Sequence, residues 1–165
     1  MTEKTITPFL SPDINSFDEL EEARAAHERY LIRQQDTDLE KAVECYVNAI
    51  KMNPALPEAY FRLASLLLIK GQISVDGAIE QCKTALSLDP KNPNAHIYTG
   101  YFQCLNGNFI EAEKEFAQAI SNSGVNSARP RLFLSKVLLN ASSSSGDISS
   151  DIISFQLWVI FFILR

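Results

Sequence analysis

The chain has 165 residues, and 46% of them are hydrophobic, which is enough for one domain with a continuous core. Its formal net charge is −5, and its 15 Lys and Arg residues are scattered with no run longer than a pair. A nucleic-acid partner is therefore not expected, because binding to a phosphate backbone depends on clustered Lys and Arg.

The chain begins with a segment that we expect to be irregular. Residues 1–15 contain two prolines with several Ser and Thr, and they lack the charged-then-apolar plan of a signal peptide. We interpret them as a flexible lead-in. Asn15 or Ser16 is the predicted N-cap of a first helix that runs to about Gln35.

Two further helices follow from their boundary signals. Asp36-Thr37-Asp38 is the predicted turn and cap of the second helix, and Asn53-Pro54 ends it, because proline cannot continue the hydrogen-bond ladder. Pro57 suits the first turn of the third helix. Gly71 is the predicted left-handed C-cap that closes it.

The remaining elements repeat this cycle. Ser74 or Asp76 opens a fourth helix that ends at Asp89-Pro90, and residues 94–106 and 109–120 form the fifth and sixth. No segment alternates with period two over a useful length, so we expect no sheet. Residues 126–140 form a seventh, amphipathic helix that would cover the open end of the stack.

A phrase of thirteen residues recurs along the chain. Residues 42–54 read AVECYVNAIKMNP, residues 78–90 read AIEQCKTALSLDP, and most of the phrase starts again at Ala112. The three phrases begin 36 and then 34 residues apart. A unit of this length is too short to bury its own apolar face, which indicates a solenoid of stacked repeats.

These residues resemble the tetratricopeptide repeat (TPR) family, whose unit is a helix pair of about 34 residues. The second helix of the family's unit carries an Ala, aromatic, Ala, Pro series, and the first helix carries a small residue. The matching positions are Ala42, Tyr46, Ala49, Pro54, Ala78, Ala85, Pro90, Ala112, Phe116 and Ala119 in second helices, and Ala64 and Gly100 in first helices.

The chain departs from the family pattern at three places. Cys82 replaces the aromatic residue of the second phrase, and Gly124 stands where the third unit would have its proline. The segment from Gln72 to Gly77 is two residues longer than the family's inter-helix turn. We therefore expect a lengthened or shifted turn after Gly71.

The resemblance implies an all-α, right-handed superhelical TPR solenoid of about three helix pairs plus a C-terminal capping helix. The predicted TPR domain covers residues 16–140. Its units are residues 16–54, 57–90 and 93–122, with the capping helix at 126–140.

In this family the first helix of each pair lines a concave groove that receives a peptide. Carrying the register over from Ala64 and Gly100 predicts a partner-binding wall made of Phe61, Ser65, Leu68, Asn94, Ile97, Tyr101 and Cys104. Such a wall is apolar and aromatic, which favours an apolar or amphipathic partner segment. The alternative is that these side chains pack against a neighbouring helix, including the chain's own ends.

Some family members clamp the terminal carboxylate of chaperone tails with convergent Lys, Arg and Asn side chains. The corresponding wall positions here carry Phe, Ser, Ile and Tyr, and the register turns the nearest cation, Arg62, away from the wall. A desolvated carboxylate needs charged partners. We therefore do not expect chaperone tails to bind through such a clamp.

Catalytic and metal chemistry find no support in the sequence. His27 and His96 are the only histidines, about two units apart, and we interpret them as packed or rim residues. Cys45, Cys82 and Cys104 lie far apart in apolar helical patterns, which is typical of buried thiols in a reducing compartment. We predict no enzyme activity, no cofactor and no metal.

The chain changes character after residue 140. Residues 141–151 form a Ser-rich linker, and residues 152–165 are almost wholly apolar up to Arg165. The thirteen residues 152–164 span about 20 Å as a helix, short of the ~30 Å hydrocarbon core. They could be a membrane tail anchor or interfacial segment, the packed end helix of a decayed fourth repeat, or the product of a truncation or read-through.

The sequence thus predicts a cytoplasmic protein–protein interaction module or assembly adaptor that binds a protein or peptide partner in the concave groove. Two alternatives stay open. One is a membrane-tethered, tail-anchored TPR factor on the cytosolic face of a membrane, with contact through residues 152–164. The other is the N-terminal TPR part of a larger enzyme.

Overall fold

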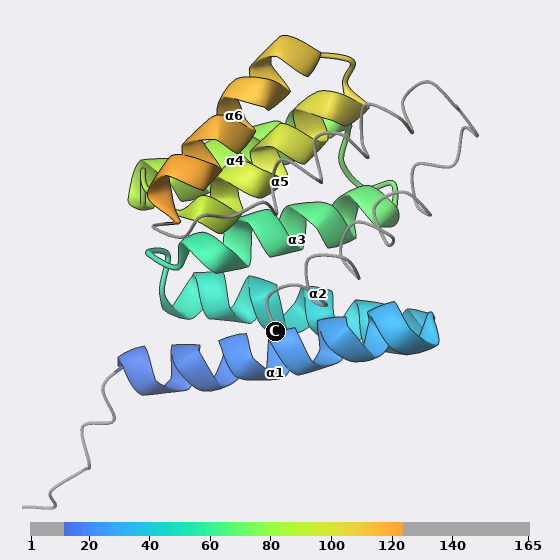
Figure 1. Cartoon of the computed structure of the whole chain (residues 1–165). Coiled ribbons are helices and arrows are strands. Elements are labelled where there is room, and N and C mark those ends of the chain that lie inside the picture. The colour runs from blue at the N-terminus through green and yellow to red at the C-terminus, as the bar shows by residue number, and fades with distance from the viewer. Residues whose placement is uncertain (1–11, 124–165) are drawn as a thin grey trace, which may run out of the picture.

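The computed structural model describes residues 12–123, and all regular structure within them is helical. Six helices follow one another along the chain (Figure 1). Their bounds are α1 (Pro12–Arg33), α2 (Asp36–Met52), α3 (Pro57–Ile69), α4 (Val75–Leu88), α5 (Pro93–Leu105) and α6 (Phe109–Asn122). The predicted capping helix 126–140, the linker 141–151 and the apolar segment 152–165 lie outside the described residues.

Most helix boundaries are where the sequence signals place them. Proline begins both α3 and α5, at Pro57 and Pro93, where its missing N–H costs no hydrogen bond. The Ser74 hydroxyl accepts from the Gly77 N–H at 3.1 Å and so caps α4. Asn92 caps α5 in the same way, accepting from the Ala95 N–H at 3.0 Å.

Two glycines terminate the first helices of the second and third pairs. Gly71 has φ +65° and Gly107 has φ +77°, which are left-handed conformations that glycine adopts without strain. The connection between α3 and α4, which contains Gly71, covers residues 70–74. The connection between α5 and α6 covers only residues 106–108. The predicted lengthened turn is therefore confirmed.

The start of α1 and its connection to α2 differ from the prediction. α1 begins at Pro12, so Asn15 and Ser16 lie inside the helix and neither is its cap. Proline is well suited to a helix's first turn, and the sequence signal at residue 16 was overridden by this earlier start.

The turn between α1 and α2 lies at Gln34 and Gln35, not at Asp36-Thr37-Asp38. Gln34 adopts φ 55°, and its side-chain amide donates to the carbonyl oxygens of Tyr30 at 3.3 Å and Leu31 at 3.0 Å. Asp36 and Asp38 belong to the first turn of α2, where negative charge is favoured by the helix dipole. The acidic residues thus mark the start of the helix without capping it.

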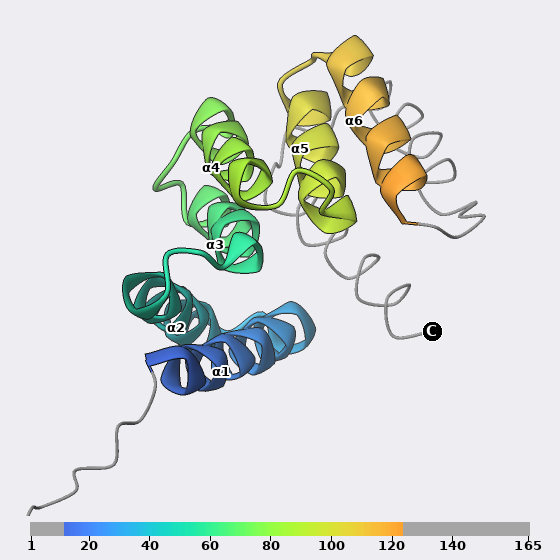
Figure 2. The same ribbon diagram turned by 90° about the vertical axis from the view of Figure 1, so that its left-hand side faces the viewer.

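The helices pack in pairs, α1 with α2, α3 with α4 and α5 with α6, and each pair contacts the next. Figure 2 shows the pairs arranged along an arc, with α1, α3 and α5 on its inner side and α2, α4 and α6 on its outer side. α3 joins the two halves of the core. Leu63 and Leu66 belong to the cluster with α1 and α2, while Phe61 and Ala64 belong to the cluster with α4, α5 and α6.

The residues that recur in the thirteen-residue phrase form the buried contacts of the second helices. Pro54 and Pro90 are exposed in the turns, whereas the repeated Ala, aromatic or Cys, and Ala positions are at most 1% exposed. These positions are Ala42, Tyr46 and Ala49 in α2, Ala78, Cys82 and Ala85 in α4, and Ala112, Phe116 and Ala119 in α6. The phrase therefore reports how the repeats stack, because small side chains allow close helix contact and large ones fill the space between.

Two helices approach each other closely at Gly100. A β-carbon at this position would lie 3.0 Å from the Phe116 ring and 3.2 Å from the carbonyl oxygen of Ala112. Neither can move easily, since Phe116 is buried and Ala112 belongs to the backbone of α6. Gly100 is thus required by the contact between α5 and α6 and not by its own backbone conformation.

We expect Gly100→Ala to lower the free energy of unfolding by about 1 to 3 kcal/mol, the usual cost of overpacking a well-filled contact. Gly77→Ala is the matched control, because a β-carbon there would meet Ile73 at an ordinary 3.4 Å. It should leave stability unchanged or raise it by up to about 1 kcal/mol, since alanine favours helix more than glycine does. Urea unfolding followed by circular dichroism measures both, and equal effects of the two substitutions would contradict the packing role of Gly100.

Candidate functional site

The structure places all seven residues of the predicted wall on two neighbouring inner helices. Phe61, Ser65 and Leu68 come from α3, and Asn94, Ile97, Tyr101 and Cys104 come from α5. α3 and α5 also contact each other directly. The register carried over from the repeat pattern therefore gathers these residues on adjacent helices.

Phe61 and Ser65 are the most deeply buried of the seven, although the Tyr101 ring also packs against that of Phe102, with 5.7 Å between their centroids. The Phe61 ring is 1% exposed and packs against the ring of Tyr98, with 4.8 Å between their centroids. Ser65 is fully buried, and its hydroxyl donates to the carbonyl oxygen of Arg62 at 2.6 Å. Both residues therefore help to hold α3 in the core, and packing accounts for their side chains.

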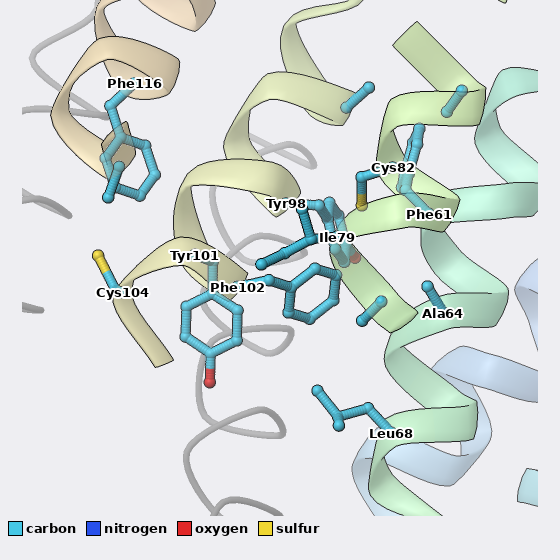
Figure 3. Packing of buried hydrophobic residues seen from close by; sticks show 14 residues of the cluster. Phe61, Ala64, Leu68, Ile79, Cys82, Tyr98, Tyr101, Phe102, Cys104 and Phe116 are labelled. Carbon is cyan, nitrogen blue, oxygen red and sulfur yellow. The ribbon is translucent and has the colours of Figure 1, made fainter. Parts of the chain in front are cut away.

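The other five differ in how far they are covered. Asn94 and Ile97 are half-buried, whereas Leu68, Tyr101 and Cys104 are 8%, 4% and 8% exposed. Figure 3 shows Leu68 and Tyr101 projecting from their two helices toward the same side of the cluster. None of these side chains carries a charge, so the surface they form is suited to an apolar ligand.

A cluster of charged residues that the sequence reasoning missed lies between α1 and α3. The Arg24 guanidinium pairs with both carboxylate oxygens of Glu58, one through its Nε at 2.9 Å. Arg62, one turn further along α3, donates from its Nε to Glu58 Oε1 at 2.7 Å. Arg24 also pairs with Glu21 on its own helix.

The structure adds a partner to Arg62, which the repeat register turns away from the wall. Its side chain is only 14% exposed and lies in the space between helices, paired with Glu58. Burying a cation is costly unless a carboxylate compensates it, and Glu58 provides that carboxylate. The signal available in the sequence was the spacing of Glu58 and Arg62 by four residues in a helix, which favours an ion pair. Nothing in the sequence indicated Arg24 as the second partner.

The electrostatic balance of this cluster is visible in the carboxyl group of Glu58. Burial disfavours its charged form, but the hydrogen bonds and charges of Arg24 and Arg62 outweigh burial and hold the pKa of Glu58 below its usual value. Glu58 is therefore ionised at neutral pH. It joins α1 to α3 across the first and second helix pairs.

The two histidines are packed, as the sequence predicts. His27 is 1% exposed, and its Nδ1 lies 3.4 Å from the Tyr46 hydroxyl. His96 is 8% exposed, with Nδ1 2.7 Å from Glu115 Oε2 and Nε2 3.0 Å from the carbonyl oxygen of Pro90. His96 thus links α5 to α6 and to the preceding turn. Glu115 provides the α6 side of this link.

The three cysteines are buried free thiols, which confirms that part of the prediction. Burial raises the pKa of the Cys104 thiol to about 11, so it is mostly protonated at neutral pH and reacts slowly while it stays buried. Within residues 12–123 no three His, Cys, Asp or Glu side chains come together in a way that could hold a metal ion. In the same part of the chain, no helix has both the length and the apolar character needed to cross a membrane.

Stacked helix pairs with a shared inner face define the class of α-helical repeat solenoids. Family matches specify which one: "TPR repeat" over residues 37–71, and "Tetratricopeptide repeat" over residues 57–92 and again over residues 82–114. The chain belongs to the tetratricopeptide repeat family. Its fold is accordingly an all-α TPR solenoid.

A curated relative and two solved structures illustrate the similarity. The chain is 31% identical over 109 residues to the small glutamine-rich tetratricopeptide repeat-containing protein 2 of Mycosarcoma maydis. The aligned part is 66% of this chain but 30% of that protein, so the chain spans about a third of the relative's length.

Both solved structures are TPR domains described with Hsp70 ligands. The TPR2B domain of yeast Sti1, in complex with pHsp70, is 25% identical with a TM-score of 0.57, covering 76% of this chain and 97% of that one. The second TPR domain of human RPAP3, in complex with the HSP70 peptide SGPTIEEVD, is 21% identical with a TM-score of 0.60, covering 77% and 98%.

Because the pKa of Glu58 is lowered in the folded state, its contribution to stability is full above the unfolded pKa of about 4.3 and is lost as pH falls through the folded value. At pH 7 we expect Glu58→Gln to lower the free energy of unfolding by about 1 to 3 kcal/mol, the range for charge-assisted hydrogen bonds. The difference from the unmodified chain should shrink below about pH 4.3.

Glu80→Gln is the control for this prediction, because Glu80 forms an exposed pair with Lys83 on α4. Such surface pairs contribute between about 0 and 1 kcal/mol. Urea unfolding at pH 7, 5 and 3.5 measures both substitutions. A Glu58→Gln effect that does not change with pH would show that the carboxylate's charge contributes nothing to the link between α1 and α3.

Proposed function

We propose that this protein is a non-catalytic interaction module that binds an apolar or amphipathic segment of a partner protein on the inner face of α3 and α5. The observation that carries the proposal is the character of that face. Ile97 and Asn94 are half-buried beside Leu68, Tyr101 and Cys104, and all five are uncharged. An amphipathic helix can dock on such a surface by burying apolar side chains at helical spacing.

The choice of an apolar ligand over an acidic one rests on the Arg24, Glu58 and Arg62 cluster. The relatives from yeast and human were solved with Hsp70 ligands, which supports peptide binding by this fold. In this chain, however, Arg24 of α1 and Arg62 of α3 already share the Glu58 carboxylate. An incoming carboxylate would have to displace Glu58 and leave it buried without a partner, which is unfavourable.

The mechanism is equilibrium binding to a preformed surface. The pairing of α3 with α4 and of α5 with α6 fixes the inner helices before any ligand arrives. Little conformational entropy is then lost by the protein on binding, which leaves more of the contact energy for affinity. A module of this kind links partners without changing them chemically.

The test uses the full chain and a phage-displayed library of random 16-residue peptides with free carboxyl ends, with SGPTIEEVD as a reference peptide. We expect enriched sequences to carry apolar residues at positions i, i+3, i+4 and i+7. Ile97→Asp should weaken their binding at least tenfold by fluorescence anisotropy, because a charge would be buried against an apolar ligand.

Ile110→Asp is the matched control, since Ile110 is 73% exposed on α6, away from α3 and α5. It should leave affinity unchanged, and circular dichroism shows that both variants are folded. The proposal fails if no peptide is enriched, or if Ile97→Asp and Ile110→Asp bind equally. It also fails if SGPTIEEVD binds more tightly than the apolar peptides and Arg62→Met abolishes that binding.

A further inference from the structure

The apolar side chains of the proposed binding face are largely buried and belong to the core cluster that also contains Phe61 and Phe102. Leu68, Tyr101 and Cys104 are 8%, 4% and 8% exposed, although the repeat register assigns them to the inner face. A partner segment can dock only on surface that it can reach. Access to these side chains therefore limits how well a partner can bind them.

The sequence contains a segment suited to cover them. Residues 152–164 read IISFQLWVIFFIL, in which eleven of thirteen residues are apolar and the two others, Ser154 and Gln156, are uncharged. An apolar run of this length is rarely left in water. As a helix it is about 20 Å long, too short for the ~30 Å hydrocarbon core of a bilayer.

We propose that residues 152–164 dock in cis on the inner face of α3 and α5, where they cover Leu68, Tyr101 and Cys104 and compete with a partner. This inference rests on the proposed function, because it names the regulator of the same face. The segment acts as an internal ligand. The apparent affinity for a partner is then reduced by the fraction of molecules in which the face is occupied.

The dimensions of the two surfaces agree. α3 and α5 have 13 residues each and are therefore about 20 Å long, which matches the length of the thirteen-residue segment as a helix. Residues 123–151 connect α6 to the segment. Even with residues 126–140 as the predicted capping helix, about 22 Å long, the fourteen other residues of this connection give it enough reach to return to α3 and α5.

The absence of charge on both surfaces also favours their contact. Neither the segment from Ile152 to Leu164 nor the face formed by Leu68, Ile97, Tyr101 and Cys104 carries a charged side chain. Their contact buries no unpaired charge, which would be costly. The charged cluster of Arg24, Glu58 and Arg62 is already internally paired and has no need of the segment.

The chain provides its own reporters for a test on the full-length protein. Cys104 lies on the covered face, while Cys45 and Cys82 lie in the outer helices α2 and α4 and serve as references. Labelling with N-ethylmaleimide, resolved by mass spectrometry, gives a rate for each thiol. In Trp158→Asp/Phe161→Asp we expect Cys104 to react at least tenfold faster, with Cys45 and Cys82 unchanged.

Gln156→Asp is the matched control, because it adds the same charge at a position of the segment that is already polar. It should leave all three rates within about twofold of the unmodified chain. The expected rates are independent of protein concentration from 1 to 100 µM. Cys104 protection that increases with concentration would assign the segment to a second copy and overturn docking in cis.

A second measurement covers the case in which the double variant unfolds and all three thiols react quickly. Trp158 is the only tryptophan of the chain, so its fluorescence reports on the segment alone. In the unmodified chain its emission should be blue-shifted and protected from acrylamide. Ile97→Asp should remove both effects, and Ile110→Asp should not. Trp158 emission that is unchanged by Ile97→Asp overturns the proposal.

Two further results separate this inference from the proposed function. If Trp158→Asp/Phe161→Asp changes neither the Cys104 rate nor the affinity for a selected peptide, docking in cis fails while peptide binding stands. If the segment protects Cys104 but no peptide binds with or without the substitutions, the proposed function fails while docking stands. Sedimentation of the unmodified chain with phosphatidylcholine vesicles, with Cys104 exposed, would assign the segment to a membrane and overturn the inference.

Discussion

The close approach of the two helices in each pair is the contact on which the rest of the structure depends. Gly100 allows α5 to lie against Phe116 and the backbone of α6, and buried alanines occupy the repeated positions of the second helices. Once the pairs are this compact, their remaining apolar faces are narrow and can be covered only by the next pair. The solenoid follows from that requirement, and so does the common inner face of α1, α3 and α5.

The inner face is not uniform along the arc. Toward α1 it is dominated by Arg24, Glu58 and Arg62, which satisfy one another and hold the first pair against the second. Toward α5 it is uncharged and carries the side chains proposed to receive a ligand. One end of the face therefore contributes rigidity and the other contributes apolar contact area. A charge substitution would consequently have different effects at the two ends.

The sequence was sufficient to predict the second helix of each pair and most helix boundaries. Ala42, Ala78 and Ala112 start phrases whose spacing requires a helical repeat, and Gly71 and Pro57 mark turns through backbone preferences that do not depend on tertiary contacts. The prediction placed the start of α1 about one turn too late. Several polar residues near this end of the helix could each serve as its cap, and the sequence does not distinguish between them.

The contacts of Arg24 with Glu58 and of His96 with Glu115 could not be predicted from the sequence, for a different reason. Arg24 and Glu58 are 34 residues apart, and His96 and Glu115 are 19 apart, so no local pattern could pair them. These contacts depend on how helices pack within a pair, for His96 and Glu115, and between pairs, for Arg24 and Glu58, and this packing is set by the core. Of the predicted wall residues, Phe61 and Ser65 were placed on the right helix, but their contacts with Tyr98 and Arg62 required the packed structure.

The connection between α3 and α4 is longer than the one between α5 and α6, but it does not change how the repeats pack. The first two phrases begin 36 residues apart, yet the additional length is absorbed in residues 70–74 and the buried alanines of α4 keep their places. Gly71 and Gln72 are exposed there, and a β-carbon on Gly71 would meet nothing within 4 Å. This turn is therefore a natural attachment point, where a dye, an epitope or an extra loop can be added without disturbing the stack.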